Sequence, residues 1–306
     1  MRATFPKFTA LVLLAAAVLV GLRFAQNSPL LALVQEKEQP TNAPPPPVET
    51  TDQARQLLAA AAQSLAQHPS VRARLRQHID LLGHPLYGPG GYVQQGNRFR
   101  MELALQLSSG TRNFVQIGDG RFLWTYEEAG GQPQLSYVDL WRVKDVLDQA
   151  EPSVHPEQAE LMLQGGLARL LTTLRVNFGM SLVGETLLGE VPCWVLHGRR
   201  TDALRDNAGR GLDVLSTEGL LALSPDEARA FLGKGDLMPY RIEFYKTADS
   251  RSAAPRPEPT LVVSIEVFDV QFDGPIDENE LSVPADLPEL DETDAYLSRF
   301  GLGESE

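Results

Sequence analysis

The side chains that could do chemistry in this sequence are few, and their spacing favours none of the common reactions. The single cysteine, Cys193, lies in the apolar run 191–196, where a thiol serves as a small hydrophobic side chain. Five acidic residues gather late in the chain without the spacing of a calcium-binding EF-hand loop: Asp269, Asp273, Asp277, Glu278 and Glu280. The histidines lack zinc-site spacing: His68, His78, His84, His155 and His197. The sequence therefore predicts no catalytic residue, no metal site and no cofactor.

Motifs and charge exclude further classes. The chain has no G-x-S-x-G nucleophile elbow, no P-loop, no dinucleotide-binding glycine pattern and no H-E-x-x-H. Its formal net charge of −13 and isoelectric point near 4.9 argue against binding to a phosphate backbone, which needs clustered lysine and arginine. We expect a protein that is not an enzyme and has no nucleic-acid partner.

Apolar side chains, by contrast, are arranged so that they could line a core or a ligand cavity. Residues 112–126 read as a β-hairpin around Asp119-Gly120, a dipeptide typical of type I′ turns. Alternation puts the large side chains of two strands, and the leucines of a later helix, each on one face. A greasy concave face of this kind could be a filled core or a ligand cavity. The cavity candidates are Phe99, Met101, Leu103, Leu105, Phe122, Trp124, Tyr126, Leu170, Leu171 and Leu174.

The elements that must position these residues follow from periodicity. Helical spacing predicts helices over 51–67, 141–149, 157–164 and 167–176, and a capping box at Ser224 predicts a short helix ending before Gly233. Alternation predicts strands over 71–82, 98–107, 134–140, 181–185, 193–199, 240–246 and 260–272, with a Gly/Pro-rich loop over 83–91. Consecutive strands with short turns imply an antiparallel meander, and the mid-chain helices need a sheet to bury against.

The N-terminal region indicates export. Arg2 and Lys7 precede an uncharged apolar run over residues 8–22, so residues 1–23 are a signal peptide or a signal anchor. Because a small-residue cleavage site is missing, we favour an anchor that leaves the rest of the chain outside the cytoplasm. The proline-rich residues 24–50 are a linker, 51–288 the folded domain and 289–306 an acidic tail or a short docked helix.

The order of these pieces resembles the LolA-like outer-membrane lipoprotein carrier superfamily. The resemblance covers about residues 50–288 and rests on Asp119-Gly-Arg-Phe-Leu-Trp-Thr-Tyr126, on Tyr240-Arg-Ile-Glu-Phe-Tyr245 and on the late strand from Ile265 to Pro284, where Leu281 replaces the usual phenylalanine. It implies an α+β fold: a strongly curved antiparallel sheet, an unclosed β-barrel, covered on its concave side by helices. It also implies an arginine that gates the cavity, for which Arg98 and Arg100 are both candidates.

Two functions follow from this reading. The first is extracytoplasmic, periplasmic-side binding or carriage of a lipid or acylated protein in an apolar cavity, by a domain held at the membrane through residues 8–22. The second is a non-catalytic interaction or sensor module of the same fold, with a filled core and no transported ligand. An open cavity would favour the first function, and a cavity packed shut would favour the second.

Overall fold

The computed structural model describes residues 51–81, 84–107, 110–129, 131–150, 154–201, 225–247 and 258–303. The strands are β1 (Ser70–Leu81), β2 (His84–Gln95), β3 (Arg98–Leu107), β4 (Gly110–Gly118), β5 (Phe122–Ala129), β6 (Gln132–Asp139), β7 (Phe178–Leu188), β8 (Val191–Arg200), β9 (Glu227–Gly233), β10 (Pro239–Lys246), β11 (Thr260–Phe272) and β12 (Glu289–Asp291). The helices are α2 (Thr51–Gln67), α3 (Leu140–Ala150), α4 (Pro156–Leu163), α5 (Gly166–Asn177), α7 (Thr293–Arg299) and the 3₁₀ turn η3 (Glu278–Leu281). The predicted signal and linker, residues 1–50, lie outside the described residues.

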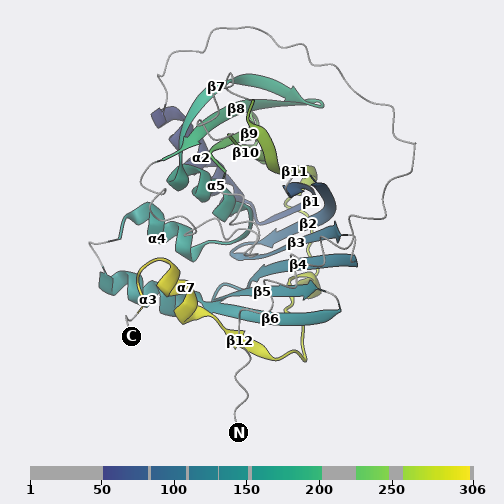
Figure 1. Ribbon diagram of the computed structural model, residues 1–306, viewed down its shortest axis with the longest axis vertical. Helices are drawn as coiled ribbons and strands as arrows, with labels where there is room; N and C mark the ends of the chain where they lie inside the picture. The colour runs from purple at the N-terminus through teal and green to yellow at the C-terminus, as the bar shows by residue number, and fades with distance from the viewer. Residues whose placement is uncertain are drawn as a thin grey trace.

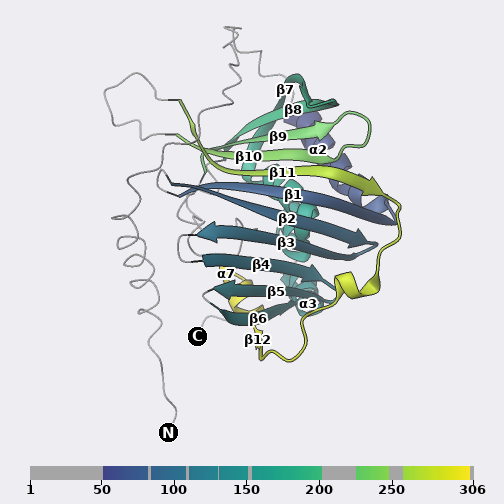
Figure 2. The same ribbon diagram turned by 90° about the vertical axis from the view of Figure 1, so that its right-hand side faces the viewer.

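The strands form one sheet of twelve in the order β12-β6-β5-β4-β3-β2-β1-β11-β10-β9-β8-β7. Every pairing is antiparallel except the parallel contact of the short β12 with β6. Strands β12 and β7 are the two edges, so the sheet does not close into a barrel. The helices lie on one side of the curved sheet, and Figures 1 and 2 show this from two directions. The predicted α+β class, an unclosed barrel with helices on its concave side, is confirmed.

The two faces of the sheet have separate apolar clusters. The main cluster fills the space between the concave face and the helices, and it includes Leu75 of β1, Met101 of β3 and Leu123 of β5. A second, smaller cluster lies on the outer face of β4, β5 and β6, under the chain that follows η3. Successive residues of a strand point to opposite faces, so each strand of this region contributes to both clusters.

The glycine- and proline-rich stretch 83–91 was expected to be a loop, and this prediction is wrong. Residues from His84 onward form β2, which pairs along its length with β1. A Cβ added at Gly90 would lie 2.3 Å from the carbonyl oxygen of Glu102 on β3. Glycine therefore permits a close approach of the two backbones, a known use of glycine inside strands.

The prediction of a short helix from the capping box at Ser224 is also wrong. Ser224 lies outside the described residues, and Glu227–Gly233 is strand β9, paired with β8 on one side and β10 on the other. Its alternate residues Ala228, Ala230 and Leu232 are fully buried. Ladder hydrogen bonds on both sides outweigh the local capping signal, because helix propensity is a weak prior against tertiary pairing.

The turn at Asp119 is a hairpin, as predicted, but it is not of type I′. Gly120 has φ of +98°, whereas Asp119 does not have positive φ. Instead the Asp119 carboxylate accepts hydrogen bonds from the backbone amides of Arg121 (2.8 Å) and Phe122 (2.7 Å). A side chain that mimics a backbone turn replaces the second left-handed residue.

The end of the chain adopts the docked-helix alternative. Strand β12 joins the edge of the sheet at β6, and α7 follows it directly. Three side chains of this region, Tyr296, Leu297 and Phe300, are buried in the main cluster. The C-terminal helix is therefore part of the layer that covers the concave face (Figure 1).

Candidate functional site

The concave face of β3 meets helix α5. Met101 and Leu103 lie in the main cluster with Leu170, Leu171 and Leu174, and none of these five side chains is more than 3% exposed. Their helical and strand spacing explains this, because each set occupies one face of its element. The structure thus brings together the β3 and α5 residues predicted to line a cavity.

The start of α5 is packed tightly against the same face. Gly165 and Gly166 lie on the ring of Phe99, so that an added Cβ at Gly165 would come within 2.3 Å of it. Gly166 has φ of +58°, and its amide donates a 2.9 Å hydrogen bond to Oε1 of Gln116, on β4. At this point the space between helix and sheet is filled by Phe99 itself.

Leu105 marks the margin of the layer. It is half-buried against the main cluster, and it lies opposite Arg112 in the β3–β4 register. Arg112 forms a 2.7 Å ion pair with Glu127 of β5, and both side chains are mostly buried. The apolar layer therefore ends in a paired charge near the β3–β4 hairpin.

The three aromatic candidates of β5 do not face the helices, and the expectation that they point inward is wrong. Trp124 belongs to the outer cluster, and Phe122 and Tyr126 pack against that cluster from its edge. The indole nitrogen of Trp124 donates a 2.9 Å hydrogen bond to Oδ2 of Asp119. Their neighbour Leu123 is the β5 residue that joins the main cluster. Alternation grouped the aromatics correctly but did not say which face the helices cover.

Neither arginine considered as the gate lies in the layer. Arg98 and Arg100 alternate with Phe99 and Met101 and so belong to the outer face of β3. Arg100 donates a 3.0 Å hydrogen bond to the carbonyl oxygen of Ser282, in the chain that covers the outer cluster. Arg100 thus helps to hold the C-terminal segment against the sheet.

A different arginine is buried, and it was missed by the sequence reasoning. Arg169, in the first turn of α5, is 1% exposed. Its Nη1 donates a 2.9 Å hydrogen bond to the hydroxyl of Tyr296 on α7, while Nε and Nη2 have no partner among the described residues. The only signal in the sequence was that an arginine lies between Leu167 and Leu170 in a leucine-rich run. Exposed faces of helices often carry an arginine at such a position, so the run did not indicate a buried charge.

A second buried polar network ties α2 to β2. The hydroxyl of Tyr92 donates a 2.6 Å hydrogen bond to Oε1 of Gln94, whose amide donates to the carbonyl oxygen of Leu65 at 3.0 Å. Burial raises the pKa of the Tyr92 phenol well above its usual value. The phenol thus stays neutral and serves as a fixed donor beneath the helix.

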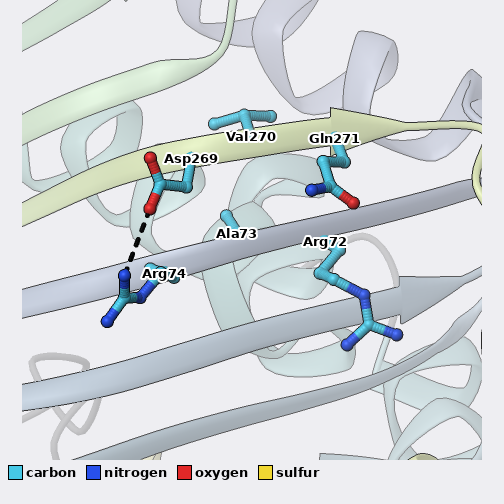
Figure 3. Close-up of a pocket in the computed structure, with 6 residues that line it drawn as sticks. All are labelled: Arg72, Ala73, Arg74, Asp269, Val270 and Gln271. Atoms are coloured by element: carbon cyan, nitrogen blue, oxygen red, sulfur yellow. Dashed lines mark hydrogen bonds and ion pairs between the residues drawn. The ribbon is translucent and has the colours of Figure 1, made fainter.

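A pocket of about 380 Å³ lies elsewhere, at the irregularity where β1 and β11 change register. Figure 3 shows Arg72 and Arg74 leaving β1 there, with Asp269 3.3 Å from Arg74 across the strands. The residues that line it are Arg72, Ala73, Arg74, Asp269, Val270 and Gln271. None of the predicted cavity residues contributes to this pocket.

Reactive groups are placed as follows. Cys193 is a free, fully buried thiol whose pKa is raised by burial. Within the described ranges, no group of three or more His, Cys, Asp or Glu side chains could hold a metal ion. Among those same residues no helix is long and apolar enough to cross a membrane, and residues 8–22 lie outside them.

Comparisons with known proteins concern the fold. No protein-family model and no curated protein matches the sequence. Solved structures that match include a conserved protein from Thermus thermophilus (TM-score 0.44, 14% identity, 78% of this chain and 99% of that one) and lipoprotein LppX from Mycobacterium tuberculosis (0.35, 9%, 74% and 97%). A LolA superfamily protein from Nitrosomonas europaea also matches (0.30, 12%, 75% and 97%). At these identities and TM-scores, none of these similarities transfers a fold family, a role or a ligand to this chain. The architecture of the described residues, an unclosed and mostly antiparallel sheet covered by helices, is the arrangement that the sequence resemblance implied.

Proposed function

We propose that this protein binds a lipid or a lipidated protein, without catalysis, in the apolar layer between helix α5 and the concave face of the sheet. The observation that carries the proposal is the composition of this layer. Met101, Leu103 and three leucines of α5 meet there with their side chains removed from water. An acyl chain can replace such contacts one for one, because the hydrophobic effect is not directional.

The unclosed sheet supports this function. In a closed barrel, widening the interior breaks ladder hydrogen bonds, whereas here β12 and β7 are free edges of one sheet. Helix α5 can therefore move away from β3 at the cost of apolar contacts and of the Gly166–Gln116 hydrogen bond. An incoming acyl chain would restore most of the apolar contacts.

A second function is favoured by one specific observation. Gly165 and Gly166 leave no space beside Phe99, so the layer is packed shut at the start of α5. A filled layer of this kind suits a non-catalytic interaction or sensor module that carries no ligand. The two functions differ in whether the layer opens for an acyl chain.

The test is ligand capture by the purified full chain. Native mass spectrometry with lipid extraction, followed by titration with a fluorescent acyl probe, is expected to show a bound lipid and saturable uptake. Leu103→Glu places a charge in the layer and should abolish uptake, whereas Leu187→Glu, at a side chain 66% exposed on β7, should not. Because Leu103 is fully enclosed, the Leu103 variant will also be strongly destabilised, and its unfolding curve must be measured. If the wild type carries no lipid and takes up no probe, the interaction or sensor module is the function that remains.

We also propose that the protein acts on the outer side of the cytoplasmic membrane, held there by residues 8–22. The apolar run and the missing cleavage site support this. N-terminal sequencing of the mature protein is expected to find the run intact in the membrane fraction. A start near residue 26 or later would show that a signal peptide is removed.

A further inference from the structure

The guanidinium of Arg169 is buried, and no counter-ion faces it among the described residues. Its side chain is 1% exposed, and no carboxylate of the described residues lies within ion-pair distance of it. One nitrogen, Nη1, is satisfied by the hydroxyl of Tyr296, whose ring also lies 5.6 Å from the guanidinium carbon. Arginine does not lose its proton in proteins, so a positive charge is buried where α5 meets Tyr296 of α7.

The two unpartnered nitrogens lie on the same edge of the guanidinium. Nε and Nη2 of arginine point their N–H bonds in parallel, and both are unpaired in Arg169. This edge matches two oxygens of a single carboxylate or phosphate, which accept two parallel hydrogen bonds. The unpaired edge of Arg169 therefore fits a ligand group of definite chemistry, an anion with two neighbouring oxygens.

The position of Arg169 near the start of α5 also favours an anion beside it. The residue lies in the first turn of α5, where the helix dipole is positive and disfavours a cation. Gly165 at the N-cap supplies no capping side chain, and one turn further along the helix the buried hydroxyl of Thr173 also has no partner among the described residues. A buried, unpaired charge costs several kcal/mol. A bound anion would offset both the cost of burying the unpaired charge and the unfavourable interaction of the guanidinium with the helix dipole.

Helix α7 is the cover of this site. It places Tyr296 on Arg169 and Leu297 in the main cluster. Its polar attachments include Asp139 N to Thr293 Oγ1 at 2.9 Å and the Tyr296 hydroxyl to the carbonyl oxygen of Met162 at 2.8 Å. The exposed ion pair of Asp294 with Arg142 is a further attachment. A helix of seven residues held by these contacts can be displaced more readily than strands paired along their length.

We propose that Arg169 binds the anionic headgroup, a carboxylate or phosphate, of an amphiphile whose chain enters the apolar layer beside α5 when α7 moves. This inference rests on the proposed lipid-binding function and specifies its ligand. The headgroup takes the Nε and Nη2 edge, and the chain takes the place of apolar contacts that α7 and α5 make in the closed form.

The test compares probes that differ only in their headgroup. The purified full chain is titrated with decanoate, decyl phosphate and 1-decanol, and separately with acetate and inorganic phosphate. The wild type is expected to bind decanoate or decyl phosphate at least about tenfold more tightly than decanol, because charge-assisted hydrogen bonds to one edge contribute that much. Comparison of the two acids identifies the headgroup, and the short anions test whether the chain is needed.

Two matched variants test whether the preference for acids comes from the Nε and Nη2 edge of Arg169. Arg169→Met should reduce binding of the acids to the level of decanol and leave the unliganded melting temperature equal or higher, because a buried unpaired charge is replaced by an apolar side chain. Arg175→Met, on the same helix but at an arginine paired with Glu160, should lower the melting temperature and keep the preference for acids. A preference that survives in Arg169→Met would overturn the proposal.

The remaining outcomes distinguish a failure of the Arg169 site from a failure of the proposed lipid-binding function. If decanol binds as tightly as the acids, lipid binding stands and the Arg169 site falls. If no amphiphile binds, both fall, and if inorganic phosphate binds as tightly as decyl phosphate, the site takes a free anion and not a headgroup. Should Arg169→Met fail to fold, Tyr296→Phe serves instead. This variant removes the hydroxyl that bonds Nη1 and the carbonyl oxygen of Met162 and leaves the Nε and Nη2 edge unchanged. The preference for acids should therefore persist or increase, and its loss would overturn the proposal.

Discussion

The indole nitrogen of Trp124 is hydrogen-bonded to Oδ2 of Asp119 at 2.9 Å, five residues earlier in the chain and across the β4–β5 turn. The other carboxylate oxygen accepts from the amides of Arg121 and Phe122. One side chain therefore both forms the turn and fixes the largest aromatic ring of the outer cluster. This explains why the turn does not need the type I′ backbone.

Replacing Asp119 by alanine should destabilise the protein. The change removes three hydrogen bonds, two of them partly buried, and we expect the free energy of unfolding to fall by about 1–3 kcal/mol. Asp119→Asn keeps one acceptor oxygen and should lose less. Urea denaturation followed by tryptophan fluorescence measures both. Equal losses in the two variants would show that the carboxylate pair is not what stabilises the turn.

Gly166 should not tolerate a side chain. Gly166→Ala forces a left-handed residue with φ of +58° and presses its Cβ to 2.9 Å from the Phe99 ring, so a loss of about 1–3 kcal/mol is expected. Gly91→Ala is the control, because a Cβ there meets nothing within 4 Å and should cost nothing. Combining Gly166→Ala with Phe99→Leu should recover part of the loss, and strictly additive effects in thermal unfolding would refute the tight contact.

The Arg72–Glu280 pair should make stability depend on pH in acid. Arg72 donates to both carboxylate oxygens, at 2.6 and 2.8 Å, and these hydrogen bonds lower the pKa of Glu280. A lowered folded-state pKa gives stability that is present above the unfolded value, about 4.3, and is lost as pH falls through the folded value. Because both side chains are about one-third exposed, the contribution is under about 1 kcal/mol.

Glu280→Gln tests this pair. Its deficit in the free energy of unfolding relative to the wild type should be present at neutral pH and disappear in acid, below the lowered pKa of Glu280. Glu278→Gln, at a neighbouring exposed residue without an ion pair among the described residues, should show no such deficit. A deficit that is the same at every pH would attribute the effect of Glu280 to its capping hydrogen bond with Asp277.

Cys193 should be inert in the folded protein. It is fully buried on β8, and burial raises the pKa of its thiol, so the reactive thiolate is scarce at neutral pH. A thiol-specific chromogenic reagent should label it only after denaturation in urea. Cys193→Ala removes one buried sulfur atom and should cost less than about 2 kcal/mol. Rapid labelling of the native protein would contradict the buried position.

Local pattern alone predicted the elements whose own residues carry the signal. Alternation located β3, β10 and β11, and the leucine spacing of 167–176 located α5, because in these segments one face is apolar and the other polar. The unclosed sheet with helices on its concave side was implied by the resemblance to the LolA-like superfamily, not by these patterns. The individual strands and helices could be located because their faces repeat every two and 3.6 residues, periods that the backbone geometry sets.

The tertiary structure decided what local pattern does not contain. The Gly/Pro-rich stretch became strand β2, and the segment that follows a helix-capping signal became strand β9. In both cases the segment pairs with a strand on each side, and these ladder hydrogen bonds outweigh local propensity. Alternation placed Leu123 and Trp124 on opposite faces, but the side on which the helices pack decided which of them joined the main cluster. For Arg169, the same residue type is a solvated surface group or a buried charge, and the docking of α7 makes it the second.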